Sequence, residues 1–339
     1  MKKTLKTLMH WCLRILFILL MLLAVVGGFG YWLSPPQVDF NSPYHPFVSA
    51  QAQINYLAAY DKRAQNWPVA SSQRIVETSQ GRTFVRISGA DNSAAMLLLH
   101  GSGGNSLQWL SAIEKLSAVH KVFALDIMFD YGRSIPHQEF NNVEDYMLWL
   151  NEVMEQLSPM QKVNIVGLSY GAWIAGQYAQ HYPEKIEKVV LLAPAGVVAP
   201  LSEGFIARAV SVMLPTQFFT RNFIYWLAQD TFNQGAEKKQ LLEEHIAEAY
   251  LAISSFTSRQ MVYPNVFSDQ QLANLKAPVL FMVGENEKIY SAELALQRLA
   301  DAAPNIHTKI IRGAGHDLIM AQPEQVAEQI VRFLDSKLK

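Results

Sequence analysis

A regular alternation of short apolar runs with longer segments of helical pattern most limits how this chain can fold. The apolar runs are four to six residues long and rich in Val, Ile and Leu. Such runs are typical of strands buried on both faces, and the intervening helices supply the crossovers that parallel strands need. The sequence therefore predicts an α/β protein with a doubly wound, mostly parallel sheet. The first runs are Met96–Leu99, Val122–Ile127, Val163–Leu168 and Val189–Leu192, separated by helical patterns at Leu107–Val119, Val143–Leu157 and Ala172–His181.

A long helical block interrupts this alternation. The pattern of strands and helices stops near Pro200, and the residues that follow have helical periodicity and many Phe, Tyr, Trp and Met side chains. We therefore predict a helical cap at 200–275, inserted between two parts of one core at 71–199 and 276–339. After the cap the alternation resumes at Pro278–Val283, Ala292–Ala302, Thr308–Ile311 and Pro323–Leu338.

The segment before the alternating region has two parts. Residues 34–70 begin with several prolines, which predict an extended tether, and continue as an amphipathic stretch around Ala50–Arg63, which predicts a helix. Two alternating runs follow, Arg74–Thr78 and Thr83–Ser88, and they indicate a hairpin that turns at Gln80-Gly81.

The N-terminus has the pattern of a membrane anchor. Residues 15–33 form an uncharged apolar run of 19 residues, which as a helix would cross about 28 Å of a hydrocarbon core roughly 30 Å thick. Segment 1–14 carries basic residues and no acidic ones, which favours a cytoplasmic location for it. We expect a single transmembrane signal anchor. The basic residues are Lys2, Lys3, Lys6 and Arg14.

The orientation of the anchor predicts where the rest of the chain lies. With the N-terminus in the cytoplasm, everything after Leu33 lies on the extracytoplasmic side, which is the periplasmic face of the inner membrane in a Gram-negative cell. A cleaved signal peptide is the alternative. Gly28-Phe29-Gly30 is a poor cleavage site for one, so an uncleaved anchor is favoured.

Charge and cysteine content exclude several classes of protein. The formal net charge is −1 over 339 residues, which does not favour binding to nucleic acid or another polyanion. Cys12 is the single cysteine, so an intrachain disulfide and a cysteine-based structural zinc site are both excluded. The sequence has no phosphate-binding loop, dinucleotide fingerprint or His-Glu-x-x-His motif, and no cofactor or metal is implied.

Ser169 is the candidate nucleophile. It is the centre of Gly167-Leu168-Ser169-Tyr170-Gly171, directly between a predicted strand and a predicted helix. A serine on such a sharp turn is exposed for attack, and the flanking glycines allow neighbouring backbone to approach it. An ordinary glycine-rich turn is the alternative, and the strand–turn–helix context argues against it.

A second glycine-rich loop offers hydrogen-bond donors. His100-Gly101-Ser102-Gly103-Gly104 ends the strand at Met96–Leu99. Acyl transfer needs two backbone N–H groups directed at the developing oxyanion. We predict that these are the N–H groups of Ser102 and Tyr170. A loop that only reverses the chain is the alternative.

The base and the acid are predicted from the last strands. His316 follows the final strand in a glycine-rich loop, and a serine hydroxyl needs such a base together with an orienting acid. The acid is expected after Pro278–Val283, where Glu285 and Glu287 are both candidates and Glu287 is favoured by its spacing from Gly284. His100 is expected to be structural. The remaining histidines are expected to be surface or loop residues: His45, His120, His137, His181, His245 and His307.

Together these motifs resemble the α/β-hydrolase superfamily over about Arg74 to Leu338, in the order nucleophile, acid, histidine. The segment Asp126–Ser134 also resembles that family's loop after the next strand, in an atypical form. Glu287 stands where Asp is commoner, and a glutamate can still orient an imidazole. Branches of the family with an Asp nucleophile are not favoured, because Ser169 stands at that position.

The resemblance implies a serine hydrolase that cleaves carboxylic esters through an acyl-enzyme, and the predicted anchor places it at the membrane. The expected partners are the membrane and a small apolar ester, with a lipid-like ester such as a monoacylglycerol as one candidate. Two alternatives stay open: a carbon–carbon bond hydrolase of the meta-cleavage type, and a non-catalytic binding protein on the same fold. Cap side chains that could line a pocket or pack the cap are Met213, Phe218, Phe219, Phe223, Tyr225, Trp226, Phe232, Met261, Tyr263 and Phe267.

Overall fold

The fold is an α/β sheet with helices on both faces, seen in a computed structural model that describes residues 46–337 except 159–160, 213, 215 and 258–260. Within these residues the sheet has nine strands in the order β1-β2-β4-β3-β6-β7-β8-β9, with β5 paired to β2. The strands of the run β4-β3-β6-β7-β8-β9 are parallel, whereas β1, β2 and β5 form antiparallel pairs. The predicted fold class is confirmed. The bounds are β1 Ser71–Thr78, β2 Gly81–Ser88, β3 Ala95–Leu99, β4 Lys121–Leu125, β5 Ile135–Pro136, β6 Val163–Leu168, β7 Ile186–Leu192, β8 Val279–Gly284 and β9 His307–Ile311.

Alternate side chains of each central strand pack into different cores. In β3, Leu97 and Leu99 belong to one buried cluster, and Met96 and Leu98 belong to the other. This two-residue period is what a strand buried on both faces requires. The first cluster is covered by α4 (Val143–Leu157), α5 (Tyr170–His181), α10 (Asp269–Ala273) and α11 (Ala292–Ala302), and the second by α2 (Ala50–Ala64), α3 (Ile113–Ser117), α12 (Leu318–Ala321) and α13 (Pro323–Asp335).

The prediction of one helix at Leu107–Val119 is wrong. A 3₁₀ helix, η1 (Ser106–Trp109), and the short α3 replace it. Leu107 and Trp109 are both buried, and residues two apart cannot face the same side of an α-helix. The chain therefore tightens at η1 and restarts before α3. Elsewhere α4, β6 and α11 have the predicted bounds, and a second 3₁₀ helix, η2 (Pro183–Lys185), leads into β7.

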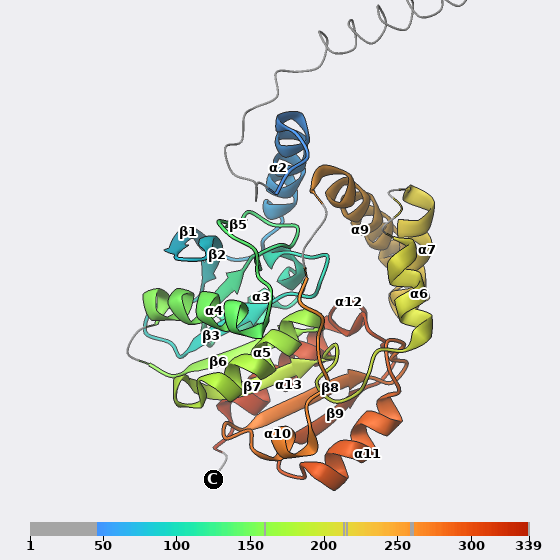
Figure 1. Cartoon of the computed structure of the whole chain (residues 1–339). Helices are drawn as coiled ribbons and strands as arrows, with labels where there is room; N and C mark the ends of the chain where they lie inside the picture. The colour runs from blue at the N-terminus through green and yellow to red at the C-terminus, as the bar shows by residue number, and fades with distance from the viewer. Residues whose placement is uncertain (1–45, 159–160, 213, 215, 258–260, 338–339) are drawn as a thin grey trace, which may run out of the picture.

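Among the described residues, the predicted cap range 200–275 holds five helices: α10 packs on the sheet, and the four before it form a separate group. In Figure 1 these helices stand together at one end of the sheet. They have a small core of their own, in which Ile224, Ala228, Leu242 and Ile246 are buried. The helices are α6 (Glu203–Ser211), α7 (Gln217–Leu227), α8 (Gln229–Phe232) and α9 (Ala236–Ser255).

Residues 261–268 lead back toward the sheet and lie over α5. There the Trp173 Nε1 and Gln177 Nε2 atoms donate to the Asn265 side-chain oxygen at 3.0 and 2.7 Å. Among the aromatic cap residues, Phe267 is buried against α5, but Phe218 and Tyr263 are 67% and 87% exposed. Phe218 and Tyr263 therefore do not pack the cap against the sheet. Met213 lies outside the described residues.

The predicted N-terminal helix is α2, and it joins the cap to the core. Tyr56 and Tyr60 on α2 are buried in the second core cluster, while Arg63 forms an ion pair with Glu248 of α9 at 2.7 Å. Figure 1 shows α2 beside α9 at the same end of the molecule. The predicted anchor at 15–33 lies outside the described residues. Within residues 46–337, apart from the gaps, no helix has the length and apolar character needed to cross a bilayer.

Candidate active site

Ser169 lies on a strained turn between β6 and α5. Its φ of +53° is in the left-handed region, which L-residues rarely adopt outside special turns. The turn is held by the Ser169 N–H, which donates to the Leu192 carbonyl at 2.8 Å. Gly171 lets the turn pack against β3, because a Cβ at that position would lie 2.3 Å from the Leu99 carbonyl oxygen. The serine side chain is therefore presented at the carboxyl edge of the sheet.

The structure brings Ser169, His316 and Glu287 into one hydrogen-bonded chain. The His316 Nε2 atom lies 3.0 Å from the Ser169 Oγ atom, and the His316 Nδ1 atom lies 3.1 Å from a Glu287 carboxylate oxygen. If Nδ1 carries the proton and donates to Glu287, Nε2 is left to accept the serine proton. This is the geometry of a nucleophile, its base and an orienting acid.

Glu287, rather than Glu285, contacts His316. The second Glu287 oxygen accepts the N–H groups of Lys288 and Ile289 at 2.8 and 2.9 Å, and its side chain is fully buried. Glu285 instead accepts the Gly313 N–H at 3.1 Å and is exposed. Two backbone donors and one imidazole thus fix the Glu287 carboxylate.

Carboxylates determine the net shift in the pKa of His316. Burial by itself lowers this pKa, but the charge of Glu287 and its hydrogen bond, with a smaller contribution from Asp317, raise it above the ordinary 6.5. The imidazolium that forms when His316 accepts the serine proton is therefore stabilised by its surroundings.

We expect kcat/KM for an ester to rise with pH through a midpoint above 6.5, because only neutral His316 can accept the Ser169 proton and its pKa is raised. Replacing Glu287 with Gln removes the main stabilising charge and should move the midpoint to lower pH. Steady-state rates across the acidic and neutral range measure both. A midpoint at or below 6.5 in the wild type, or no downward shift in the variant, would contradict this origin.

The glycine-rich loop after β3 lies against the nucleophile. A Cβ on Gly101 would be 3.4 Å from the Ser169 Cβ. The Gly101 N–H donates to the Gln108 side chain at 2.7 Å, and the Gly103 N–H donates to the Asp130 carboxylate at 2.9 Å. These bonds fix the loop on both sides of Ser102. The assignment of the Ser102 and Tyr170 N–H groups as oxyanion donors stays a prediction, and Tyr170 begins α5, whose N-terminus favours negative charge.

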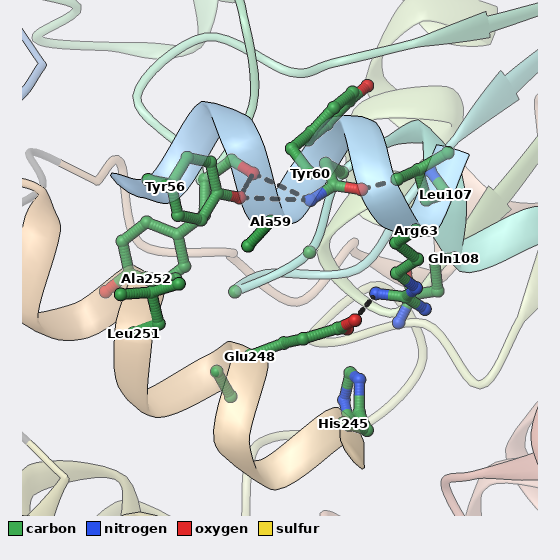
Figure 2. A pocket seen from close by; sticks show the side chains of 15 residues that line it. Tyr56, Ala59, Tyr60, Arg63, Leu107, Gln108, His245, Glu248, Leu251 and Ala252 are labelled. Carbon is green, nitrogen blue, oxygen red and sulfur yellow. Dashed lines mark hydrogen bonds and ion pairs between the residues drawn. The ribbon is translucent and has the colours of Figure 1, made fainter. Parts of the chain in front are cut away.

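Helix α2 contacts the glycine-rich loop after β3, and the sequence did not indicate this contact. The Asn105 side chain donates to the Tyr56 hydroxyl at 3.2 Å and to the Tyr131 carbonyl at 2.9 Å, and the Tyr56 hydroxyl donates to the same carbonyl. Figure 2 shows α2 and α9 facing each other across a small pocket, with the Arg63–Glu248 pair at its edge. The pocket has a volume of about 40 Å³, room for a few water molecules.

The two aspartates of the loop after β4 have structural roles. Asp126 is fully buried and accepts the N–H groups of Ser106 and Arg133 at 2.7 and 2.8 Å. Asp130, as described, holds Gly103. Both carboxylates therefore order the loops around the nucleophile rather than contact His316.

Three histidines outside the candidate site, in the described part of the chain, lie away from the surface: His100 and His120 are buried, and His245 lines the small pocket. His100 is structural, as predicted, since its Nε2 accepts the Ile127 N–H at 2.9 Å and its Nδ1 lies 2.8 Å from the Gly101 carbonyl oxygen. His120 lies in the loop between α3 and β4, as the surface or loop assignment allows, but it is 2% exposed, so the surface part of that assignment is wrong. It is also wrong for His245 on α9, whose ring lines the small pocket and whose pKa burial and Arg63 lower to about 4. Both histidines pack at helix contacts that no local pattern identifies.

Fold and site together define an α/β-hydrolase with an inserted helical cap. The sequence signature of the Alpha/beta hydrolase family matches residues 96–329, and the chain belongs to this family. Among its relatives, the carboxylesterase YbfK of Bacillus subtilis (strain 168) is 28% identical over 301 residues, which cover 86% of this chain and 98% of the relative. The chain is an enzyme of the carboxylesterase-like type.

Two further comparisons agree with this class. The crystal structure of naproxen esterase from Bacillus subtilis matches with a TM-score of 0.77 at 27% identity, covering 84% of this chain and 99% of the esterase. The human monoacylglycerol lipase ABHD6 is 21% identical over 261 residues, which cover 71% of this chain and 75% of the lipase.

Proposed function

We propose that this protein hydrolyses carboxylic esters through an acyl-enzyme on Ser169. The observation that carries the proposal is the unbroken chain of hydrogen bonds from the Ser169 hydroxyl through His316 to Glu287. The strained backbone of Ser169 and its contact with the loop at Gly101 support it. The relatives named as carboxylesterases support an ester as the substrate class.

Each group in the site has a distinct step. The Ser169 oxygen attacks the ester carbonyl as His316 accepts its proton, and Glu287 stabilises the imidazolium. The Ser102 and Tyr170 N–H groups hold the oxyanion of the tetrahedral intermediate. His316 then protonates the leaving alcohol. A water molecule, activated by the same imidazole, releases the acid and restores the serine.

Turnover of p-nitrophenyl esters, set against a vinylogous diketone acid, tests the type of reaction. We expect ester hydrolysis that depends on Ser169 and little cleavage of the carbon–carbon bond, because relatives that match most of the chain are named as carboxylesterases. Preference for the diketone acid would instead assign a carbon–carbon bond hydrolase. A purified protein that is not labelled by a fluorophosphonate would indicate a non-catalytic binding protein.

We also propose that residues 15–33 anchor the enzyme and hold the catalytic domain on the extracytoplasmic side of the membrane. The length of the uncharged run and the four basic residues before it support this. An anchored esterase would meet lipid-like esters such as a monoacylglycerol at the surface of the bilayer.

Protease accessibility tests this topology. Protease added outside spheroplasts should degrade a reporter that is fused after Lys339. A second reporter, one that works only in the cytoplasm, should be inactive when it is fused at the same position. Activity of the cytoplasmic reporter would refute the orientation. Release of the full-length chain by salt alone would refute the anchor.

A further inference from the structure

Several cap residues contact the two loops that carry His316 and Glu287, and three of these contacts come from Trp226, Asp230 and Thr231. They lie at the end of α7 and in α8. The Lys288 ammonium, next to Glu287, donates to the Trp226 carbonyl at 2.9 Å. Asp230 accepts the Asn286 side-chain N–H at 2.9 Å. The third contact, from Thr231, reaches the residue beside His316.

Thr231 contacts Asp317 with two donors. Its backbone N–H and its hydroxyl donate to the same Asp317 carboxylate oxygen at 2.9 and 2.6 Å. Thr231 is fully buried and Asp317 is 8% exposed, so solvent does not replace these bonds easily. Charge-assisted bonds of this length are among the stronger hydrogen bonds in proteins.

The other Asp317 oxygen turns back toward the histidine loop. It accepts the Gly315 N–H at 3.1 Å, so the carboxylate fixes the backbone on both sides of His316. Asp317 also precedes α12, where an aspartate commonly caps the helix with its side chain, but it makes no such bond here. The carboxylate is committed to Gly315 and Thr231 instead.

We propose that Thr231 is a positioning residue for the catalytic reaction. Through Asp317 it holds the backbone around His316 so that the imidazole stays within hydrogen-bond distance of Ser169. The cap thereby completes the triad geometry as well as covering the site. This inference rests on the proposed function, since it assumes that His316 is the base.

Replacing Thr231 with Val removes the hydroxyl with little change in shape and tests the proposal. We expect kcat for a p-nitrophenyl ester to fall about tenfold, because a small displacement of the base is expensive, while KM changes less than about threefold. The rate of inactivation by a small fluorophosphonate should fall by the same factor, since that reagent needs the triad but little of the cap pocket. Thr231→Ser, which keeps the hydroxyl, should stay within about threefold of the wild type.

Thr220→Val is the matched control. Thr220 is also a buried cap threonine, 1% exposed, but its hydroxyl donates only to the Thr216 carbonyl of its own helix at 3.3 Å. We expect this variant to behave like the wild type. Thr231→Val should also have little further effect in an Asp317→Ala background, because the acceptor is then absent.

Several results would overturn the proposal. Among them are unchanged kcat in Thr231→Val, an effect confined to KM, an equal loss in Thr220→Val, and full additivity with Asp317→Ala. If Thr231→Val does not fold, Thr231→Ser tests the proposal in its place. A tenfold loss of kcat in Thr231→Ser would overturn the proposal, because that variant keeps the hydroxyl donor. Ser169→Ala in the same assay distinguishes failure of the proposed function from failure of this inference. Full activity there contradicts the proposed function, whereas its loss beside an unaffected Thr231→Val contradicts only this inference.

Discussion

Ser169→Ala is expected to lower kcat for a p-nitrophenyl ester by roughly 10⁴- to 10⁶-fold, while the fold stays intact. The alanine cannot form the acyl-enzyme, so only the oxyanion donors and substrate binding remain to accelerate the reaction. Because the φ of Ser169 is +53°, alanine retains the strain of the turn, and the free energy of unfolding should change little. Steady-state assays measure kcat, and denaturant unfolding followed by circular dichroism of the same preparation measures the free energy of unfolding.

Fluorophosphonate labelling provides the control for this variant. The wild type should be labelled once per chain and the alanine variant not at all, because the reagent bonds to the activated serine oxygen. Activity within about tenfold of the wild type would exclude Ser169 as the nucleophile, since loss of this group in a triad has a far larger effect. Labelling that persists in Ser169→Ala would point to another serine.

Glu287→Gln is expected to lower kcat at least about a hundredfold, and Glu285→Gln to change it little. An amide in place of the Glu287 carboxylate cannot stabilise the imidazolium and favours the wrong tautomer of His316. Glu285 is the matched control, because it lies two residues away, is exposed, and accepts the Gly313 N–H instead of contacting His316. Steady-state kinetics on the two purified variants make the comparison.

The reverse pattern would transfer the role of the acid to Glu285. If both variants stay active, the acid must lie elsewhere, although Asp126 and Asp130 are engaged with backbone N–H groups of other loops. Unfolding of Glu287→Gln is a separate outcome, visible by circular dichroism. In that case Glu287→Asp, which keeps the charge but shortens the reach, would be expected to retain part of the activity.

The order of strands and helices was predictable because it depends on local periodicity. The bounds of α4, β6 and α11 match the hydrophobic pattern, because α4 and α11 each bury one regular face and β6 is a continuous run buried on both faces. The nucleophile was equally accessible, because a strand, a sharp turn and a helix lie within one short stretch of sequence. The break between η1 and α3 could not be predicted from the sequence, because it depends on which side chains are buried against the sheet.

The sequence by itself determined the fold class, the nucleophile and a short set of candidates for the base and the acid. Only the tertiary structure decided which of them meet, because Ser169 and His316 are 147 residues apart and His316 and Glu287 are 29 apart. The choice of Glu287 over Glu285 depends on how one loop turns toward another. The contact of Thr231 with Asp317 spans 86 residues and carries no local signature. Such contacts are set by the packing of the cap on the sheet, and hydrophobic periodicity describes each element alone.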